Sequence, residues 1–158
     1  MKNSKTEQTQ TLLIGIGNTG RADDGLGWLF LNRIKQLYPD RFEFEYRYQL
    51  QVEDAELISN FDTVLFIDAT VDDLPDGIAL KRCEPATEYF YSSHMQSPEA
   101  ILYLAKTLYN KQPETSVLQI TGYEWNLGKP LSSPARQNLD CAADLFRKNY
   151  ILQEEPSY

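Results

Sequence analysis

The feature that most constrains the fold is the alternation of short apolar runs with segments of helical periodicity. The runs TLLIGIG (11–17) and TVLFIDA (63–69) have the continuous apolar character of strands buried on both faces. Between them, residues 25–38 carry apolar side chains at helical spacing, and Pro39 ends the pattern. Buried strands that alternate with helices predict an α/β sandwich around a largely parallel sheet.

The rest of the chain continues this alternation. Residues 42–50 alternate aromatic with charged or polar side chains, which predicts a strand near a sheet edge with one solvent-facing side. Further strands are expected at 77–84 and 116–123, and further helices at 52–61, 97–110 and 133–152. Ser97-Pro98 and Ser133-Pro134 begin the last two helices, because Ser is a favoured N-cap and Pro is tolerated in the first turn.

Composition and charge exclude several classes of protein. The 158 residues suffice for one buried core, expected over 11–152 between polar tails at 1–10 and 153–158. A formal net charge of −8 disfavours a nucleic-acid partner. No run reaches the roughly 18 apolar residues of a membrane span, and the two cysteines form no CxxC motif. We therefore expect a monomeric cytoplasmic protein that binds neither nucleic acid nor membrane.

A glycine-rich loop follows the first expected strand. Gly15-Ile16-Gly17-Asn18-Thr19-Gly20 matches the GxGxxG pattern of dinucleotide-binding loops. Asp23 and Asp24 follow at the start of the helix, where their charges would repel a pyrophosphate. Glu53 lies beyond the spacing of about 20 residues at which the pattern needs an acidic residue. The motif is thus weak evidence for nucleotide binding, and capping of the following helix is an alternative role for the two carboxylates.

Three separated residues form a candidate site. Asp24 follows the glycine loop, Asp68 ends the apolar run at 63–69, and His94, the only histidine, precedes the helix at 97–110. Ligands of such sheets bind outside the carboxyl ends of the strands, so we expect these side chains on one side of the sheet. One imidazole with two carboxylates suits a divalent cation or an acid–base site. Taken singly, each residue also has an ordinary structural role open to it, as a cap or a packed or surface side chain.

The sequence resembles a known family in three blocks that occur in the family's order. Leu13-Ile14-Gly15-Ile16-Gly17-Asn18 with Asp23-Asp24-Gly25-Leu26-Gly27 is similar to the signature of the hydrogenase maturation proteases, which trim the large subunit of [NiFe]-hydrogenases. Phe66-Ile67-Asp68-Ala69 resembles their second block. Ser92-Ser93-His94, with Ala100-Ile101-Leu102 downstream, resembles their histidine block. The similarity spans most of 12–150.

This resemblance implies a phosphorylase/hydrolase-like α/β fold with a mostly parallel five-stranded sheet. It also implies an endopeptidase that removes the C-terminal peptide of a nickel-loaded large-subunit precursor. The family's metal-contacting residues fall on Asp24, Asp68 and His94. The implied metal is nickel supplied by the precursor, for which cadmium or zinc can substitute in the free protein.

One departure from the family pattern points to a subgroup. Many members have Glu, which is longer by a methylene, where this chain has Asp24. The Asp-Asp-Gly form resembles the subgroup that serves bidirectional, NAD-linked hydrogenases. Gln49-Leu50 with Glu53, and Gly122-Tyr123-Glu124, resemble that subgroup as well.

The sequence offers no arrangement typical of a covalent nucleophile. Ser92 and Ser93 are sequence neighbours of His94, a spacing at which side chains in a loop rarely face one another. There is no GxSxG elbow, and Cys83 has no second histidine as a base. We therefore expect hydrolysis by a water that a metal or a carboxylate activates, with Asp23 in a supporting or alternative acid–base role. A nucleotide- or cofactor-binding module and a protein that binds the hydrogenase precursor without cleaving it remain alternatives.

Overall fold

The computed structural model describes residues 10–88 and 96–152, whose strands form one five-stranded sheet. The elements are β1 (Thr11–Ile16), η2 (Ala22–Gly25), α1 (Leu26–Leu37), β2 (Glu43–Arg47), α2 (Asp54–Ile58), β3 (Thr63–Thr70), η3 (Pro75–Gly77), β4 (Ile78–Arg82), α3 (Pro98–Tyr109), β5 (Glu114–Thr121), α4 (Ser133–Phe146) and η4 (Arg147–Ile151). The strand order is β2-β1-β3-β5-β4. All neighbouring strands are parallel except β4, which is antiparallel to β5. The expected α/β fold with a mostly parallel five-stranded sheet is therefore confirmed.

Each strand and helix expected from the sequence is present, and β2 is an edge strand as its alternating pattern predicts. The start of α3 is confirmed in detail, since the Ser97 hydroxyl accepts a hydrogen bond from the Ala100 backbone N–H at 3.0 Å. At α4 the N-cap is Ser132, one residue earlier than expected. Within the described part of the chain, no helix is long and apolar enough to cross a membrane.

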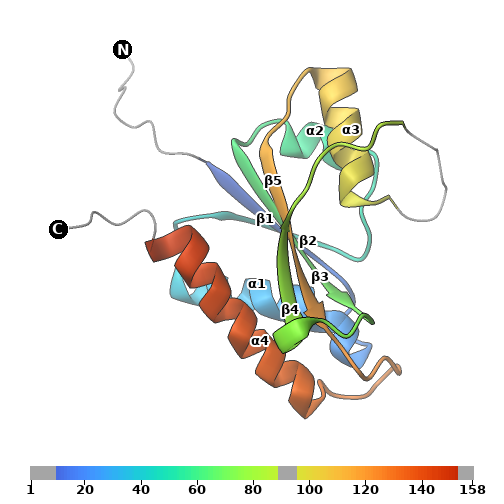
Figure 1. Ribbon diagram of the computed structural model, residues 1–158, viewed down its shortest axis with the longest axis vertical. Coiled ribbons are helices and arrows are strands. Elements are labelled where there is room, and N and C mark those ends of the chain that lie inside the picture. The colour runs from blue at the N-terminus through green and yellow to red at the C-terminus, as the bar shows by residue number, and fades with distance from the viewer. Residues whose placement is uncertain (1–9, 89–95, 153–158) are drawn as a thin grey trace.

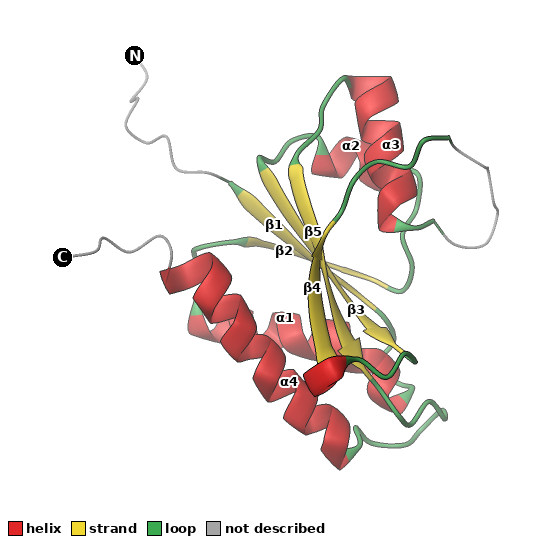
Figure 2. Ribbon diagram, viewed as in Figure 1, coloured by secondary structure: helices red, strands yellow, loops and turns green. Residues whose placement is uncertain are grey.

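The sheet lies between two layers of helices, with α1 and α4 on one face and α2 and α3 on the other (Figures 1 and 2). Alternate side chains of the central strands enter the two cores. Leu65 and Ile67 of β3 pack with α1 and α4, whereas Val64 and Phe66 pack with α2 and α3. The same alternation assigns Asp68, two residues after Phe66, to the face that α2 and α3 cover.

The first turn of α1 lies directly against the ends of β1 and β3. A Cβ atom at Gly27 would come within 2.5 Å of the Ile16 carbonyl oxygen and 2.6 Å of the Ile67 carbonyl oxygen. A Cβ at Gly15, on β1, would come within 2.6 Å of the Gly27 carbonyl oxygen. The two glycines therefore let the helix and the strands approach through their backbones, and this places the loop before α1 at the carboxyl edge of the sheet.

Replacement of Gly27 by Ala tests this close approach. The added methyl group has only backbone to push against, so we expect Gly27→Ala to lower the free energy of unfolding by about 2 kcal/mol despite the better helix propensity of Ala. Urea denaturation followed by far-UV circular dichroism measures the change. Gly20→Ala is the matched control, because its Cβ would meet only the Asn18 side chain, at 3.1 Å. Equal destabilisation of the two variants would contradict the packing argument.

Candidate active site

The loop between β1 and α1 fixes the backbone of Asp24. Gly17 has a φ of 142°, and a Cβ there would overlap the Asp24 carbonyl oxygen, so a side chain at this position is excluded. The Asn18 backbone N–H donates to that same oxygen at 3.0 Å, and the Asp24 backbone N–H donates to the Arg21 carbonyl at 3.0 Å. The glycine motif thus folds the loop back on itself and holds Asp24 at the end of β1.

Several backbone N–H groups of this loop, including those of Gly17, Gly20 and Arg21, are engaged within the protein. The Gly17 N–H donates to the Arg47 carbonyl at 2.9 Å, and the Arg21 N–H to the Asn18 carbonyl at 3.0 Å. The Gly20 N–H donates to the Asn18 side-chain oxygen at 2.8 Å. A phosphate-binding loop needs such N–H groups for its ligand. Close packing therefore accounts for the GxGxxG match, and the geometry disfavours a nucleotide site here.

Asp23 is a fully buried carboxylate surrounded by hydrogen-bond donors. It accepts from the backbone N–H groups of Tyr123 at 2.7 Å, Glu124 at 3.0 Å and Ser132 at 2.8 Å, and from the Ser132 hydroxyl at 2.6 Å. Burial raises the pKa of Asp23, but these hydrogen bonds together outweigh burial and lower the pKa below its ordinary value. Asp23 therefore ties the loop that carries Asp24 to the segment between β5 and α4.

This contact corrects the capping hypothesis for the aspartates. The N-cap of α1 is Gly25 and that of η2 is Arg21, and neither receives a side-chain cap hydrogen bond. Asp23 instead bonds to Ser132, which is itself the N-cap of α4. Because its oxygens are occupied by these donors, the geometry favours a supporting role for Asp23 over an acid–base role. The sequence gives no signal for this pairing, which joins residues 109 positions apart.

We expect Asp23→Asn to lower the free energy of unfolding by about 2–3 kcal/mol at pH 7. The amide has the same shape but presents an NH₂ group where three backbone N–H groups and the Ser132 hydroxyl all donate to the carboxylate. The lowered pKa adds a pH dependence: the stabilisation by Asp23 is present above the ordinary carboxyl pKa and is lost as the pH falls through the folded-state pKa. Urea denaturation at several pH values measures both effects, with Asp24→Asn as control, and an Asp23→Asn protein as stable as the wild type would refute the role.

Asp68 lies near the end of β3, and its carboxyl group responds to Asp24. Burial is the main cause that raises the pKa of Asp68 to about 7, and the charge of Asp24 raises it further, while a hydrogen bond from the Ala69 backbone opposes both. Burial also raises the pKa of Asp24, against the effects of the Asn18 backbone and the Arg21 charge. The charge of Asp24 therefore reaches the Asp68 carboxyl group.

The third expected site residue, His94, lies outside the described residues. The chain is described again from Gln96, which forms an isolated antiparallel bridge with Leu50, just beyond the end of β2. Within 10–88 and 96–152, no group of three or more His, Cys, Asp or Glu side chains is arranged to hold a metal ion. The described part of the site therefore contributes two carboxylates, those of Asp24 and Asp68. A cation suits such a pair of ligands because its charge offsets the repulsion between them.

Cys83 has an environment that makes its thiol unreactive. Cys83 is buried among the side chains that pack between the sheet and α2 and α3. Burial, with smaller contributions from the charges of Glu99 and Glu84, raises the pKa of its thiol to about 12. Since the thiolate is the nucleophile, a role for Cys83 in covalent catalysis is disfavoured, in agreement with the expectation from sequence.

Titration of Asp68 tests its contact with Asp24. In Asp24→Asn we expect the pKa of Asp68 to fall while staying above 3.8, because burial, the larger cause, remains. A raised pKa means that Asp68 destabilises the fold as the pH rises from about 4 to about 7, and Asp68→Asn should remove this part of the pH dependence. Carboxyl ¹³C NMR on aspartate-labelled, metal-free protein measures the pKa. An unchanged Asp68 pKa in Asp24→Asn would show that the two groups are not neighbours.

Solved structures of similar fold provide an independent comparison. The hydrogenase-maturating endopeptidase HybD from E. coli superposes with a TM-score of 0.71 at 19% identity, covering 89% of this chain and 94% of that one. The [NiFe] hydrogenase maturation protease HycI from Thermococcus kodakarensis KOD1 gives a TM-score of 0.66 at 19% identity, over 90% and 93% of the two chains. HybD from Thermococcus kodakarensis gives 0.62 at 23% identity, over 88% and 97%.

These similarities establish a shared fold. No protein-family model matches the sequence, and no curated protein matches it. The similar structures include both HybD and HycI proteins at comparable identity, so the comparison distinguishes no subgroup. At identities below 25%, the fold alone is shared with certainty, and the activity has to be argued from the residues of the site.

Proposed function

We propose that this protein is an endopeptidase that removes the C-terminal peptide from the nickel-loaded precursor of a [NiFe]-hydrogenase large subunit. The observation that carries the proposal is that the charge of Asp24, at the end of the loop after β1, raises the pKa of Asp68 on β3. The fold shared with hydrogenase maturation endopeptidases supports it. So do the three sequence blocks around Asp24, Asp68 and His94, which occur in the order of that family.

In this proposal Asp24, Asp68 and His94 contact the nickel ion that the precursor carries. Two carboxylates that repel one another gain from a cation between them, because its charge removes the repulsion. Nickel accepts imidazole and carboxylate ligands, and so the three side chains are a chemically suitable set. The metal acts here as part of the substrate: its capture aligns the peptide bond that follows it in the precursor with the two carboxylates.

The proposed hydrolysis proceeds without a covalent intermediate. A carboxylate of the pair accepts a proton from the attacking water as the oxygen adds to the peptide carbonyl carbon, and the proton then passes to the leaving amine nitrogen. This route agrees with the high pKa of the Cys83 thiol, which disfavours a cysteine nucleophile. Asp23 acts only through the loop geometry, since its oxygens are bonded to Ser132, Tyr123 and Glu124.

The finer assignments rest on sequence alone. The Asp-Asp-Gly form at Asp24 is the reason to propose the subgroup that serves bidirectional, NAD-linked hydrogenases. We also propose a cytoplasmic location for the protein. The alternative of a nucleotide-binding module is disfavoured because the backbone N–H groups of Gly17, Gly20 and Arg21 are already engaged. A protein that binds the precursor without cleaving it is distinguished by the assay below.

A cleavage assay on nickel-loaded precursor tests the proposal. We expect the wild-type protein to shorten the precursor, and Asp24→Asn, Asp68→Asn and His94→Ala each to reduce the rate by at least about 100-fold, because each removes a group that contacts the metal or the reacting bond. Mass spectrometry of the large subunit identifies the released peptide. Precursor without nickel should remain uncut.

The matched control is Asp73→Asn, which removes an exposed carboxylate in the segment after β3. It should process the precursor at the wild-type rate. Near-normal processing by Asp68→Asn or His94→Ala would overturn the residue assignment. Stable binding of the precursor without release of a peptide by the wild type would favour the non-cleaving alternative.

A further inference from the structure

A cavity of about 420 Å³ lies at the carboxyl end of the edge strand β2. Its lining residues come from the first turn of α1 and from the end of β2 and the segment after it: Trp28, Tyr46, Arg47, Tyr48, Gln49 and Gln51. Neither the coupled carboxylates nor the glycine loop supplies a lining side chain. The cavity is therefore a neighbour of the candidate active site rather than part of it.

Aromatic rings form preorganised walls in this cavity. The Trp28 indole N–H donates to the Arg47 carbonyl at 2.9 Å, which fixes the orientation of the ring. Tyr48 stacks on Trp28 with ring centroids 5.2 Å apart, and Tyr46 meets it edge-on at 5.3 Å. Tyr48 nevertheless remains 70% exposed, so one side of this aromatic stack faces solvent. Such rigid, partly exposed rings suit an apolar side chain of a partner.

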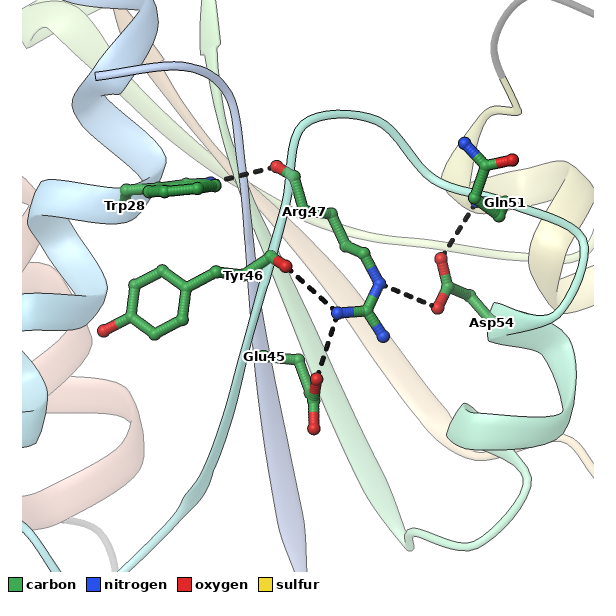
Figure 3. Close-up of polar contacts among 6 residues, drawn as sticks. All are labelled: Trp28, Glu45, Tyr46, Arg47, Gln51 and Asp54. Carbon is green, nitrogen blue, oxygen red and sulfur yellow. Dashed lines mark hydrogen bonds and ion pairs between the residues drawn. The ribbon is translucent and has the colours of Figure 1, made fainter. Parts of the chain in front are cut away.

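The charged groups beside the cavity form a cluster around the Arg47 guanidinium, as Figure 3 shows. The Arg47 guanidinium contacts the Glu45 carboxylate at 3.0 Å and the buried Asp54 carboxylate at 3.0 Å. It also donates to the Tyr46 carbonyl at 3.0 Å, while Asp54 accepts from the Gln51 backbone N–H at 2.9 Å. Two carboxylates against one guanidinium leave the cluster with a net negative charge. An anionic ligand is therefore disfavoured, although an arginine lines the cavity.

The backbone connects this cavity to Asp24. The Arg47 carbonyl, which holds the Trp28 indole, also accepts from the Gly17 N–H at 2.9 Å. Gly17 in turn packs against the Asp24 carbonyl oxygen. In the described sheet β2 is an edge strand that pairs only with β1, and an edge strand is the place where an extended peptide can add to a sheet.

We propose that this cavity binds an uncharged, apolar side chain of the extended peptide on which Asp24 and Asp68 act. The inference deepens the proposed function and rests on it for the identity of that peptide. The cavity would contribute binding energy at a distance from the reacting bond, and it would fix which residues of the peptide lie next to Asp24 and Asp68. It would thereby select a precursor with an apolar residue near the cleavage site and disfavour one with Asp or Glu at the same position.

A binding experiment tests the cavity without any cleavage. Trp28 and Trp125 are the two tryptophans of the chain, so Trp125→Phe leaves one indole N–H resonance, that of Trp28, in a ¹⁵N NMR spectrum. We expect N-acetyl-leucinamide and N-acetyl-phenylalaninamide to shift this resonance in a saturable way, and the amide of N-acetyl-aspartate to leave it unchanged. Tyr48→Ala should weaken the binding about five- to tenfold. The control, Tyr109→Ala, removes an exposed ring on α3 and should have no effect.

A processing experiment tests the role in catalysis. In the cleavage assay, Tyr48→Ala should raise KM for the precursor about five- to tenfold with kcat retained, because the lost contact is made equally in the bound and reacting states. A wild-type KM in Tyr48→Ala, or no saturable shift of the Trp28 resonance with the apolar probes, would overturn the inference. If the wild type does not cleave the precursor while the probes bind as expected, the proposed function fails and the apolar binding site stands.

Discussion

The close backbone approach between the start of α1 and the ends of β1 and β3 is the contact on which the site depends. Gly27 lies against the carbonyl oxygens of Ile16 and Ile67, and Gly17 lies against that of Asp24. Side chains at these positions would push the helix and its preceding loop away from the sheet. Because the approach is so close, the charge of Asp24 acts on Asp68 although 44 positions separate the two residues.

Two adjacent residues of the same type have opposite environments in this loop. Asp23 is fully buried yet has a lowered pKa, because four hydrogen bonds stabilise its charge. Asp24 has a raised pKa, since burial outweighs the single backbone hydrogen bond and the charge of Arg21. Asp23 therefore stabilises the structure, whereas Asp24 keeps a charge that its surroundings disfavour, which is typical of functional sites.

The carboxyl edge of the sheet carries two features with complementary properties. The Asp24 and Asp68 pair suits a cation, while the neighbouring cavity at Trp28 and Tyr48 suits an apolar side chain. A protein substrate that presents a metal ion and an extended chain together could use both. The chain shares its fold with hydrogenase maturation endopeptidases, and a shared fold by itself leaves the chemistry to these side chains.

The strands, the helices and the edge position of β2 could be predicted from the sequence, because periodicity, capping residues and turns are local signals. Asp24 and Asp68 are candidates on the same basis, since each directly follows or ends an expected strand or loop. The sequence left the role of Asp23 open between helix capping, a supporting role and an acid–base role, and it left the glycine loop as a weak nucleotide motif. The three-dimensional contacts show that Asp23 bonds to Ser132, that the glycines serve packing, and that Trp28 and Tyr48 line an open pocket. Each of these features depends on contacts between residues that are distant in the sequence. Such contacts produce no local sequence pattern from which they could be predicted.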